Sequence, residues 1–315
     1  MEDGITTVMY GVPYGKEEIT FDLLPGMRAT EIHSQPIPPL GDVPSAIDKA
    51  LAEPVNSAPL KELVKRGDTA CIVFTDITRA CPDYLLIPPI LRELHKAGVR
   101  REDITLFCGT GLHRPSTQEE RVAKLGPEVA AHYRVLDNEP QNPAAIVELG
   151  KTGGGVPLSV HKTAYDADLL IATGIVEPHQ YAGYSGARKT VAIGAAGEKT
   201  IAYTHGPAMV DHPGTRLGLI GVTPFTRQSQ RRPGAQRAFV IAKVMEVNPV
   251  VIVGSEFPEI VKETKMIPAT TIEEALEFAV SHIGRSDLDV LIIPHALLTL
   301  PYIKNWQRFA FPAQD

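Results

Sequence analysis

Short apolar runs alternate with segments of helical periodicity along the first two thirds of the chain. Thr69–Thr75, Ile104–Cys108 and Leu169–Thr173 are apolar runs of strand length bounded by polar residues or glycine, which is the pattern of buried strands. After the first run, Pro88–Ala97 carries apolar residues at helical spacing, and after the second, Ser116–Leu125 opens with a Ser-x-x-Glu capping box. Strands and helices in this order predict right-handed crossovers and a parallel sheet.

A second group of elements follows towards the end of the sequence. It comprises two segments with helical spacing and two apolar strands: Arg237–Val247, Thr271–His282, Val250–Val253 and Val290–Ile293. The region before this group is rich in Gly, Pro and Arg and shows no periodicity, as in a linker. We therefore predict an N-terminal α/β domain at 1–212, a linker at 213–235 and a short C-terminal α/β domain at 236–315.

Composition narrows the classes of function. The chain has 315 residues, of which 43% are hydrophobic and 22% charged, and a net charge of −6, as in soluble globular proteins rather than nucleic-acid-binding ones. No apolar run reaches the roughly eighteen residues that span a membrane, and the N-terminus lacks the pattern of a signal peptide. The three cysteines, Cys71, Cys81 and Cys108, are an odd number, which favours buried packing roles and a reducing cytoplasm.

Polar residues follow each of the three strands of the first group. The first set is the turn Asp76-Ile77-Thr78-Arg79, directly after the first strand. Two roles fit Arg79: its planar guanidinium can hold a carboxylate or phosphate, or it can pair with Asp76 and tie the turn. Because ligands of parallel sheets bind beyond the carboxyl ends of the strands, this turn lies where a site is expected.

The second strand leads into GTGLHRP, residues 109–115. Its two glycines allow close backbone approach, and successive N–H groups of such a turn can form a nest for an anion. The loop is neither a Walker A motif nor the dinucleotide-binding G-x-G-x-x-G pattern. His113 lies at the loop tip beside Arg114, a poor position for a core histidine, and this indicates a functional role.

The third strand leads into EPHQYAGYSGARK, residues 177–189, and His205 follows sixteen residues later. The segment combines His179 with glycines and with the neighbours Arg188 and Lys189. The like charge of Arg188 is expected to disfavour the ammonium form of Lys189, which favours a nucleophilic or covalently linked amine; alternatively, both are solvated cations at a helix end. His205 alone is weak evidence of a metal site, because no H-x-x-E-H or C-x-x-C spacing accompanies it.

Together, DITRACP, GTGLHRP and EPHQYAGYSGARK, with the later His205, resemble the nickel-dependent lactate racemase family. The resemblance runs from about residue 8 to about residue 210, and TIEEALEFA and LIIPHA are similar to the last part of the family's second domain. It implies two Rossmann-like α/β domains with parallel sheets, the second of them shortened in this chain. It also implies an active site in the cleft between the domains.

The resemblance further implies a cofactor. The family uses a nickel pincer nucleotide, pyridinium-3,5-bisthiocarboxylic acid mononucleotide, and we expect cofactor-synthesis proteins to load it. The lysine to which it is covalently attached matches Lys189, and the histidine that coordinates nickel matches His205. Five residues of the loops are expected to contact the cofactor: Thr110, Gly111, Arg114, Gly186 and Arg188.

The implied activity is that of an isomerase, a racemase or epimerase of a 2-hydroxy acid that is lactate-like or larger. Two histidines, matching His113 and His179, act as acid and base on opposite faces of the substrate while hydride moves to the cofactor. The planar keto acid can then be reduced on either face. Asp76 and Arg79 match residues that support the catalytic histidine and the substrate carboxylate.

Two departures from the family leave alternatives open. The chain is about a hundred residues shorter than typical members, with the gap after His205, and Ala187 replaces the second of two glycines that usually precede the Arg-Lys pair. One alternative is a non-catalytic or truncated relative that binds or carries the cofactor. Another is an enzyme that binds a phosphate ligand without nickel.

Overall fold

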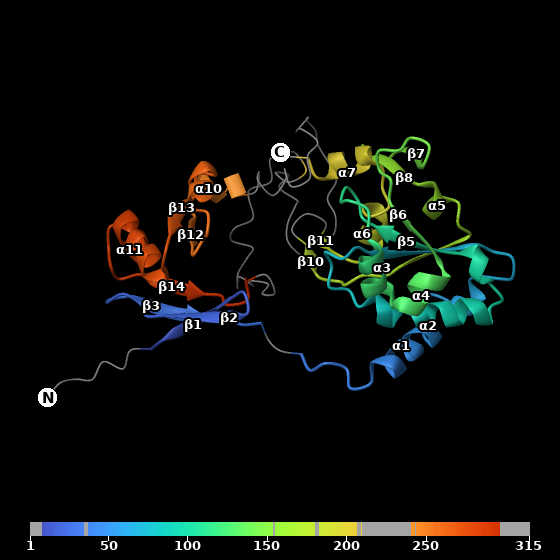
Figure 1. Ribbon diagram of the computed structural model, residues 1–315, viewed down its shortest axis with the longest axis horizontal. Coiled ribbons are helices and arrows are strands. Elements are labelled where there is room, and N and C mark those ends of the chain that lie inside the picture. Colours follow the sequence, from blue (N-terminus) through green and yellow to red (C-terminus); the bar gives the residue numbers. More distant parts are fainter. Residues whose placement is uncertain are drawn as a thin grey trace. The chain divides into compact units, whose positions relative to one another are not determined.

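The structure, a computed structural model, describes residues 8–34, 37–153, 155–179, 183–206, 209, 241–242 and 244–296. The chain forms two compact units (Figure 1). The larger unit is residues 39–239, and the smaller combines residues 1–38 with residues 240–315. The predicted linker at 213–235 lies outside the described residues.

A parallel sheet of four strands lies at the centre of the larger unit. In the order β6-β5-β4-β9, its strands are Arg134–Asp137, Ile104–Gly109, Ala70–Thr75 and Leu169–Ala172. Each neighbouring pair is parallel. The predicted parallel sheet and its three apolar strands are therefore confirmed, and β6 is an addition to the prediction.

Helices cover both faces of this sheet (Figure 1). The described helices are α1 (Val43–Ala52), α2 (Asp83–Lys96), α3 (Gln118–Leu125), α4 (Pro127–His132), α5 (Lys162–Tyr165), α6 (Ala187–Ala192) and α7 (Glu198–Thr204). Successive residues of a strand face opposite sides. Ile72 and Phe74 of β4 therefore pack with α2, α3 and α4, whereas Cys71 and Val73 pack with Ala164 of α5 and the end of α6.

Shorter elements complete the larger unit. They are the 3-10 helices Leu60–Glu62 and Arg101–Asp103, the antiparallel pair β7 (Ile146–Lys151) and β8 (Pro157–His161), and the antiparallel pair β10 (Pro178–His179) and β11 (Gly183–Tyr184). The three cysteines are buried and free, as the packing interpretation predicted. Burial raises the pKa of the Cys71 thiol to about 12, so it is not a reactive thiolate near neutral pH.

Two helices begin elsewhere than the sequence pattern predicted. Helix α2 starts at Asp83 rather than Pro88 and accommodates two prolines in its interior. Helix α3 is capped by Thr117, whose side chain accepts from the amide of Glu120 in a reciprocal capping box. The predicted cap, Ser116, instead donates its hydroxyl to Asp137 at 2.6 Å, because this carboxylate from the end of β6 lies within reach.

The smaller unit joins both ends of the chain. Its elements are β1 (Tyr10–Tyr14), β2 (Glu17–Phe21), β3 (Arg28–Glu31), β12 (Val251–Val253), α10 (Pro258–Glu263), β13 (Ile267–Ala269), α11 (Ile272–Ile283) and β14 (Asp289–Ile292). β12 pairs with β13 and β14 pairs with β3, both in parallel, whereas β1 and β2 form a hairpin. The predicted helix at 271–282 and the two predicted strands are thus confirmed, whereas part of the predicted helix at 237–247 lies outside the described residues.

The structure divides the chain differently from the predicted domain boundaries. Residues 8–34 were assigned to the N-terminal domain, but they pack with the C-terminal elements. β3 supplies the parallel partner of β14, and the Tyr14 hydroxyl donates to the carbonyl of Gly254 at 2.8 Å. Long-range strand pairing of this kind leaves no mark in local periodicity, and the sequence pattern missed it for that reason.

Candidate functional site

The three loops singled out in the sequence leave the same edge of the larger sheet. Strand β4 lies between β5 and β9, and all three run in parallel, so their carboxyl ends adjoin. The Asp76 turn follows β4, the GTGLHRP loop follows β5, and the segment that carries His179 and Lys189 follows β9. The fold therefore brings together loops that are far apart in the sequence.

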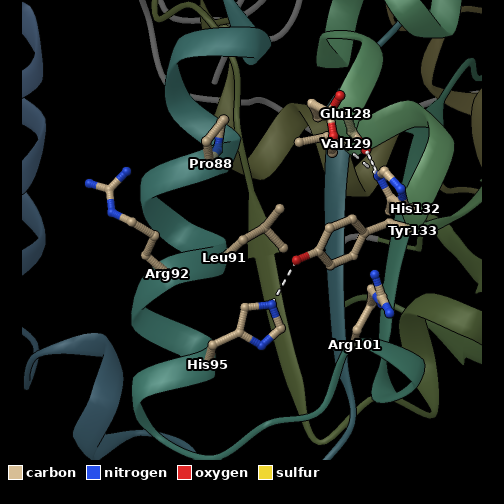
Figure 2. Close-up of a pocket in the computed structure, with 9 residues that line it drawn as sticks. All are labelled: Pro88, Leu91, Arg92, His95, Arg101, Glu128, Val129, His132 and Tyr133. Atoms are coloured by element: carbon tan, nitrogen blue, oxygen red, sulfur yellow. Dashed lines mark hydrogen bonds and ion pairs between the residues drawn. The ribbon is translucent and has the colours of Figure 1, made fainter.

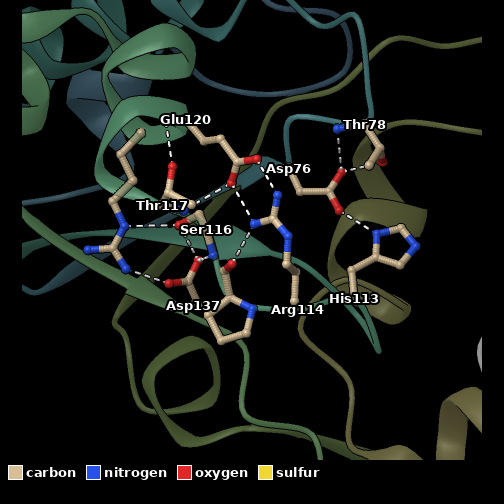
Figure 3. A network of polar contacts seen from close by, with 10 residues as sticks. Asp76, Thr78, His113, Arg114, Ser116, Thr117, Glu120 and Asp137 are labelled. Carbon is tan, nitrogen blue, oxygen red and sulfur yellow. Dashed lines mark hydrogen bonds and ion pairs between the residues drawn. The ribbon is translucent and has the colours of Figure 1, made fainter.

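Asp76 holds His113 in a fixed orientation. One carboxylate oxygen of Asp76, Oδ2, lies 2.5 Å from Nδ1 of His113. The other, Oδ1, accepts from the hydroxyl of Thr78 at 2.6 Å and from its amide at 3.2 Å (Figure 3). Burial alone would raise the pKa of Asp76, but the hydrogen bonds from His113 and Thr78 and the nearby charge of Arg79 lower it.

This contact decides which nitrogen of His113 carries the proton. A carboxylate can only accept, so Nδ1 donates, and the lone pair of the neutral ring is on Nε2. Asp76 would also stabilise the imidazolium once Nε2 has taken a proton. The suggested ion pair between Asp76 and Arg79 is absent among the described residues, where the ion-pair partner of Asp76 is His113.

Lys189 lies in α6 and is more buried than its neighbour Arg188. Burial and the nearby positive charge of Arg79 lower the pKa of Lys189 to about 8, against an opposing effect of Asp76. The direction agrees with the sequence prediction, but the predicted cause is wrong. Arg188 is exposed and is not among the causes of the shift, because water screens an exposed charge.

His179 lies in the same electrostatic environment. Its position follows from a short ladder in which His179 pairs with Gly183. Burial, together with the positive charges of Lys189, Arg79 and His205, lowers its pKa to about 4. Four groups from the segments that follow β4, β9 and α7 are therefore close enough to influence one another's protonation.

His205 follows the last residue of α7 and has a defined tautomer. Its Nδ1 lies 3.0 Å from the carbonyl oxygen of Ile201, which can only accept, so Nδ1 carries the proton and Nε2 the lone pair. This is the arrangement commonly found in metal-binding histidines. Burial lowers the pKa of His205, and Lys189 contributes to this lowering. Within the described part of the chain, no group of three or more His, Cys, Asp or Glu side chains could hold a metal.

The glycines of the loops bring α6 against the sheet. A Cβ on Gly174 would lie 2.7 Å from Cα of Gly186, and a Cβ on Gly194 would lie 2.8 Å from the carbonyl oxygen of Gly109. Gly186 has a φ of +75°, and a Cβ there would lie 2.7 Å from the carbonyl oxygen of Ile175. Both ends of α6 therefore contact strand ends backbone to backbone, which explains these glycines without any ligand.

Three N–H groups of the GTGLHRP loop, which the sequence predicted to form an anion nest, donate to carbonyls of the protein. The amides of Thr110, Gly111 and His113 donate to the carbonyls of Cys108, Gly194 and Thr110, respectively. These N–H groups are therefore satisfied within the protein. The hydroxyl oxygen of Thr110 is a different case, because it is buried and has no hydrogen-bond partner among the described residues.

Arg114 is directed away from His113 by an ion pair. Its guanidinium contacts both carboxylate oxygens of Glu120, at 2.5 and 2.8 Å (Figure 3). A fork-to-fork pair of this kind is geometrically well defined. The structure thus gives Arg114 a protein partner and leaves any contact with a cofactor as a prediction.

Sequence reasoning missed two buried charges next to the Asp76 turn. Asp83 and Lys124 form an ion pair at 2.7 Å, with side chains that are 0% and 6% exposed. Lys124 lies in α3, which is otherwise amphipathic, and no local pattern distinguishes a buried lysine in such a helix from a solvated one.

A surface pocket of about 330 Å³ lies away from these loops (Figure 2). Its lining comes from α2, α4 and neighbouring residues: Pro88, Leu91, Arg92, His95, Arg101, Glu128, Val129, His132 and Tyr133. His95 contacts the carbonyl oxygen of Val99 at 2.9 Å and the hydroxyl of Tyr133 at 2.7 Å. Its two ring nitrogens thus have protein partners, and none of the predicted site residues lines this pocket.

Comparisons with known proteins show which family the chain resembles. Residues 14–218 match the family model of the lactate racemase N-terminal domain. The chain is 29% identical over 284 residues to lactate racemase from Lactiplantibacillus plantarum, a match that covers 85% of this chain and 66% of that relative. It is 28% identical over 240 residues to lactate racemase from Thermoanaerobacterium thermosaccharolyticum, covering 75% of this chain and 56% of that relative.

A solved structure gives the same result. The lactate racemase apoprotein from Thermoanaerobacterium thermosaccharolyticum matches with a TM-score of 0.57 and 28% identity, over 67% of this chain and 49% of that chain. The matched part of the chain thus corresponds to about half to two thirds of the length of these relatives. No helix of the described residues is long and apolar enough to cross a membrane.

Proposed function

Since the chain belongs to the lactate racemase family, we propose that it is an isomerase, a racemase or epimerase of a 2-hydroxy acid that is lactate-like or larger. The observation that carries the proposal is the cluster at the edge of the larger sheet. There, His113 is oriented by Asp76, and Lys189, Arg79 and His205 each lower the pKa of His179. Two histidines beside cations suit proton transfer at a substrate that carries a carboxylate.

We propose that a nickel pincer nucleotide binds covalently at Lys189, with His205 as the protein ligand of nickel. The donor set fits this group. The pKa of Lys189 is about 8, so a reactive neutral amine is accessible near neutral pH, and His205 has its lone pair on Nε2.

When bound, this cofactor would accept hydride from the substrate carbon and return it. The protein would supply the proton transfers. Nε2 of His113 would take the hydroxyl proton of one enantiomer, and the contact with Asp76 at 2.5 Å would stabilise the resulting imidazolium. His179 would do the same for the opposite enantiomer, as a base that is neutral at pH 7 because its pKa is lowered to about 4.

Arg79 would bind the substrate carboxylate through its planar guanidinium and hold the keto acid in place between the two hydride transfers. The local charges support this role, because Arg79 and Lys189 both lower the pKa of His179. Attachment of the cofactor to Lys189 through a thioamide would remove one positive charge, and a bound carboxylate would offset that of Arg79. Both changes would weaken the charge contributions that lower the pKa of His179, whereas burial, the largest cause, would remain.

Contacts of Thr110, Gly111, Arg114, Gly186 and Arg188 with the cofactor remain part of the proposal. Within the described part of the chain, the buried hydroxyl of Thr110 lacks a hydrogen-bond partner, which supports a role for this residue beside the site. Cofactor-synthesis proteins would load the enzyme, and we place that process in the cytoplasm.

The proposal is tested with protein produced in cells that synthesise the pincer nucleotide. We expect an adduct on Lys189 by intact-mass analysis, one nickel per chain, and loss of optical rotation with at least one 2-hydroxy acid from a panel. Lys189→Ala should lose the adduct, whereas Lys199→Ala, an exposed lysine paired with Glu148 at 2.8 Å, should keep it. His113→Ala and His179→Ala should retain nickel and lose racemisation. Absence of both adduct and nickel would contradict the proposed cofactor.

A second candidate function is that of a cofactor carrier. The matched part of the chain corresponds to 49% to 66% of the relatives' length, so their activity stays a proposal for this chain. A carrier of the cofactor without turnover would show the adduct and nickel but leave every 2-hydroxy acid of the panel unchanged.

A further inference from the structure

We propose that the buried ion pair between Asp83 and Lys124 is a positioning device that holds Arg79 and Lys189 in the geometry the site requires. The inference rests on the proposed function, and it assigns two residues outside the motifs. Both side chains are almost completely buried, at 0% and 6% exposure. Asp83 lies in α2 and Lys124 in α3. Lys124 contacts the turn that carries Asp76 and Arg79.

Lys124 ties the turn to the sheet. Its ammonium lies 2.8 Å from the carbonyl oxygen of Cys81, 3.1 Å from that of Arg79 and 3.1 Å from the hydroxyl of Thr75. Its fourth partner is the carboxylate of Asp83 at 2.7 Å. Two of these four contacts are backbone carbonyls of the turn, so the position of Lys124 sets the path of the backbone from which the Arg79 side chain extends.

Asp83 connects the same network to the third strand. Its Oδ1 accepts from the hydroxyl of Thr173 at 2.5 Å and from the thiol of Cys81 at 3.3 Å. Its Oδ2 accepts from the hydroxyl of Thr75 at 3.1 Å and from Lys124. Both carboxylate oxygens are thus satisfied, and the carboxylate links the end of β4 to the residue that follows β9.

The network reaches Lys189 through Thr173. The carbonyl oxygen of Thr173 accepts from the buried hydroxyl of Thr190 at 2.9 Å, and Thr190 is the next residue after Lys189 in α6. A continuous set of hydrogen bonds therefore runs from the Arg79 turn, through Lys124 and Asp83, to the helix that carries Lys189. Arg79 in turn lowers the pKa of Lys189, so the relative position of the two cations has a measurable consequence.

A buried ion pair is weak evidence for stability, because a well-packed neutral replacement is often as stable. Neutral replacement of both residues can therefore separate a positioning role of the pair from its effect on stability. Lys124→Met leaves the Asp83 carboxylate buried without its cation and should destabilise the fold. The double variant Asp83→Asn with Lys124→Met removes both charges and should recover much of that stability, but the carbonyls of Arg79 and Cys81 still lack their donor.

The test compares this double variant with a control that lowers stability without removing any hydrogen bond of the network. Leu94→Ala shortens a fully buried side chain of α2 that has no polar atom and therefore takes no part in the hydrogen bonds of the network. In the apoprotein, Lys189 is titrated by its reactivity towards an acetylating reagent. We expect the double variant to shift the midpoint by about half a pH unit or more and the control to leave it unchanged. In the cofactor-loaded enzyme, kcat/KM should fall about tenfold or more in the double variant.

A double variant with the Lys189 midpoint and kcat/KM of the wild type would overturn the inference. Should that variant fail to fold, Thr173→Val decides the question, because it removes only the hydroxyl that joins Asp83 to the strand end and should still shift the midpoint. The titration needs no turnover. A shifted midpoint in a protein that racemises nothing would therefore support the network while contradicting the proposed function.

Discussion

Residues that are distant in the sequence fix the orientation of one site residue and lower the pKa of two others. Asp76 orients His113 across 2.5 Å, and Arg79 lowers the pKa of both Lys189 and His179. The residue types at these positions were evident from the sequence, and they permit the chemistry of acid, base and nucleophile. Their protonation states are a product of the fold.

A pKa of about 8 for Lys189 predicts a specific pH dependence. A lowered pKa means that the neutral amine is populated at lower pH than usual. About one tenth of Lys189 is then neutral at pH 7, against roughly 0.03% of an ordinary lysine. In the apoprotein, acetylation of Lys189 measured by peptide mass spectrometry should follow a titration with its midpoint near pH 8.

Arg79→Gln and Arg188→Gln form a matched pair for this measurement. Because the charge of Arg79 lowers the pKa of Lys189, its removal should raise the midpoint and slow acetylation at pH 7 by about two- to fivefold. Removal of the exposed Arg188 should leave the rate unchanged. A larger slowing of acetylation by Arg188→Gln than by Arg79→Gln would instead support the charge of Arg188 as the cause of the lowered pKa.

At the scale of elements, α6 is placed by contacts between glycines. Gly174 and Gly186 meet at its beginning, and Gly109 and Gly194 meet at its end. Ala187, which starts the helix, has a φ of +31°, a conformation that costs a residue with a Cβ more than it costs glycine. The glycines of the EPHQYAGYSGARK segment therefore serve the docking of a helix onto strand ends, and the cofactor lysine is positioned by that docking.

Gly194→Ala should strongly destabilise the larger unit. The added Cβ would lie 2.8 Å from the carbonyl oxygen of Gly109, a backbone atom that cannot move aside without displacing the strand end. We expect the free energy of unfolding in urea to fall by about 2 kcal/mol or more. Gly41→Ala is the control, because a Cβ at Gly41 meets nothing within 4 Å and should change stability by at most about 0.5 kcal/mol.

At the scale of the whole molecule, segments near both ends of the chain belong to the same compact unit. The segment 8–34 belongs with the C-terminal elements, where β3 pairs in parallel with β14. The larger unit, by contrast, builds its sheet and its core from residues 39–239 alone. The two units should therefore respond separately to changes in the N-terminal segment.

Deletion of residues 1–38 tests this division. Without β3, the strand Asp289–Ile292 loses its hydrogen-bonded partner, and amides of α11 and β14 should exchange faster with deuterium by mass spectrometry. Amides of β4 and β5 should keep the protection of the full chain, because their partners are all retained. Equal loss of protection in both units would mean that they unfold together.

The sequence by itself determined the strands β4, β5 and β9, their parallel arrangement, the helices between them and the loops that carry the site residues. Local periodicity is enough to predict these strands and helices, because they pack in layers within one unit. Tertiary structure decided the pairing of β3 with β14, the cause of the lowered pKa of Lys189 and the burial of Lys124. Each of these depends on distances between segments that are remote in the chain, and no local pattern encodes such distances.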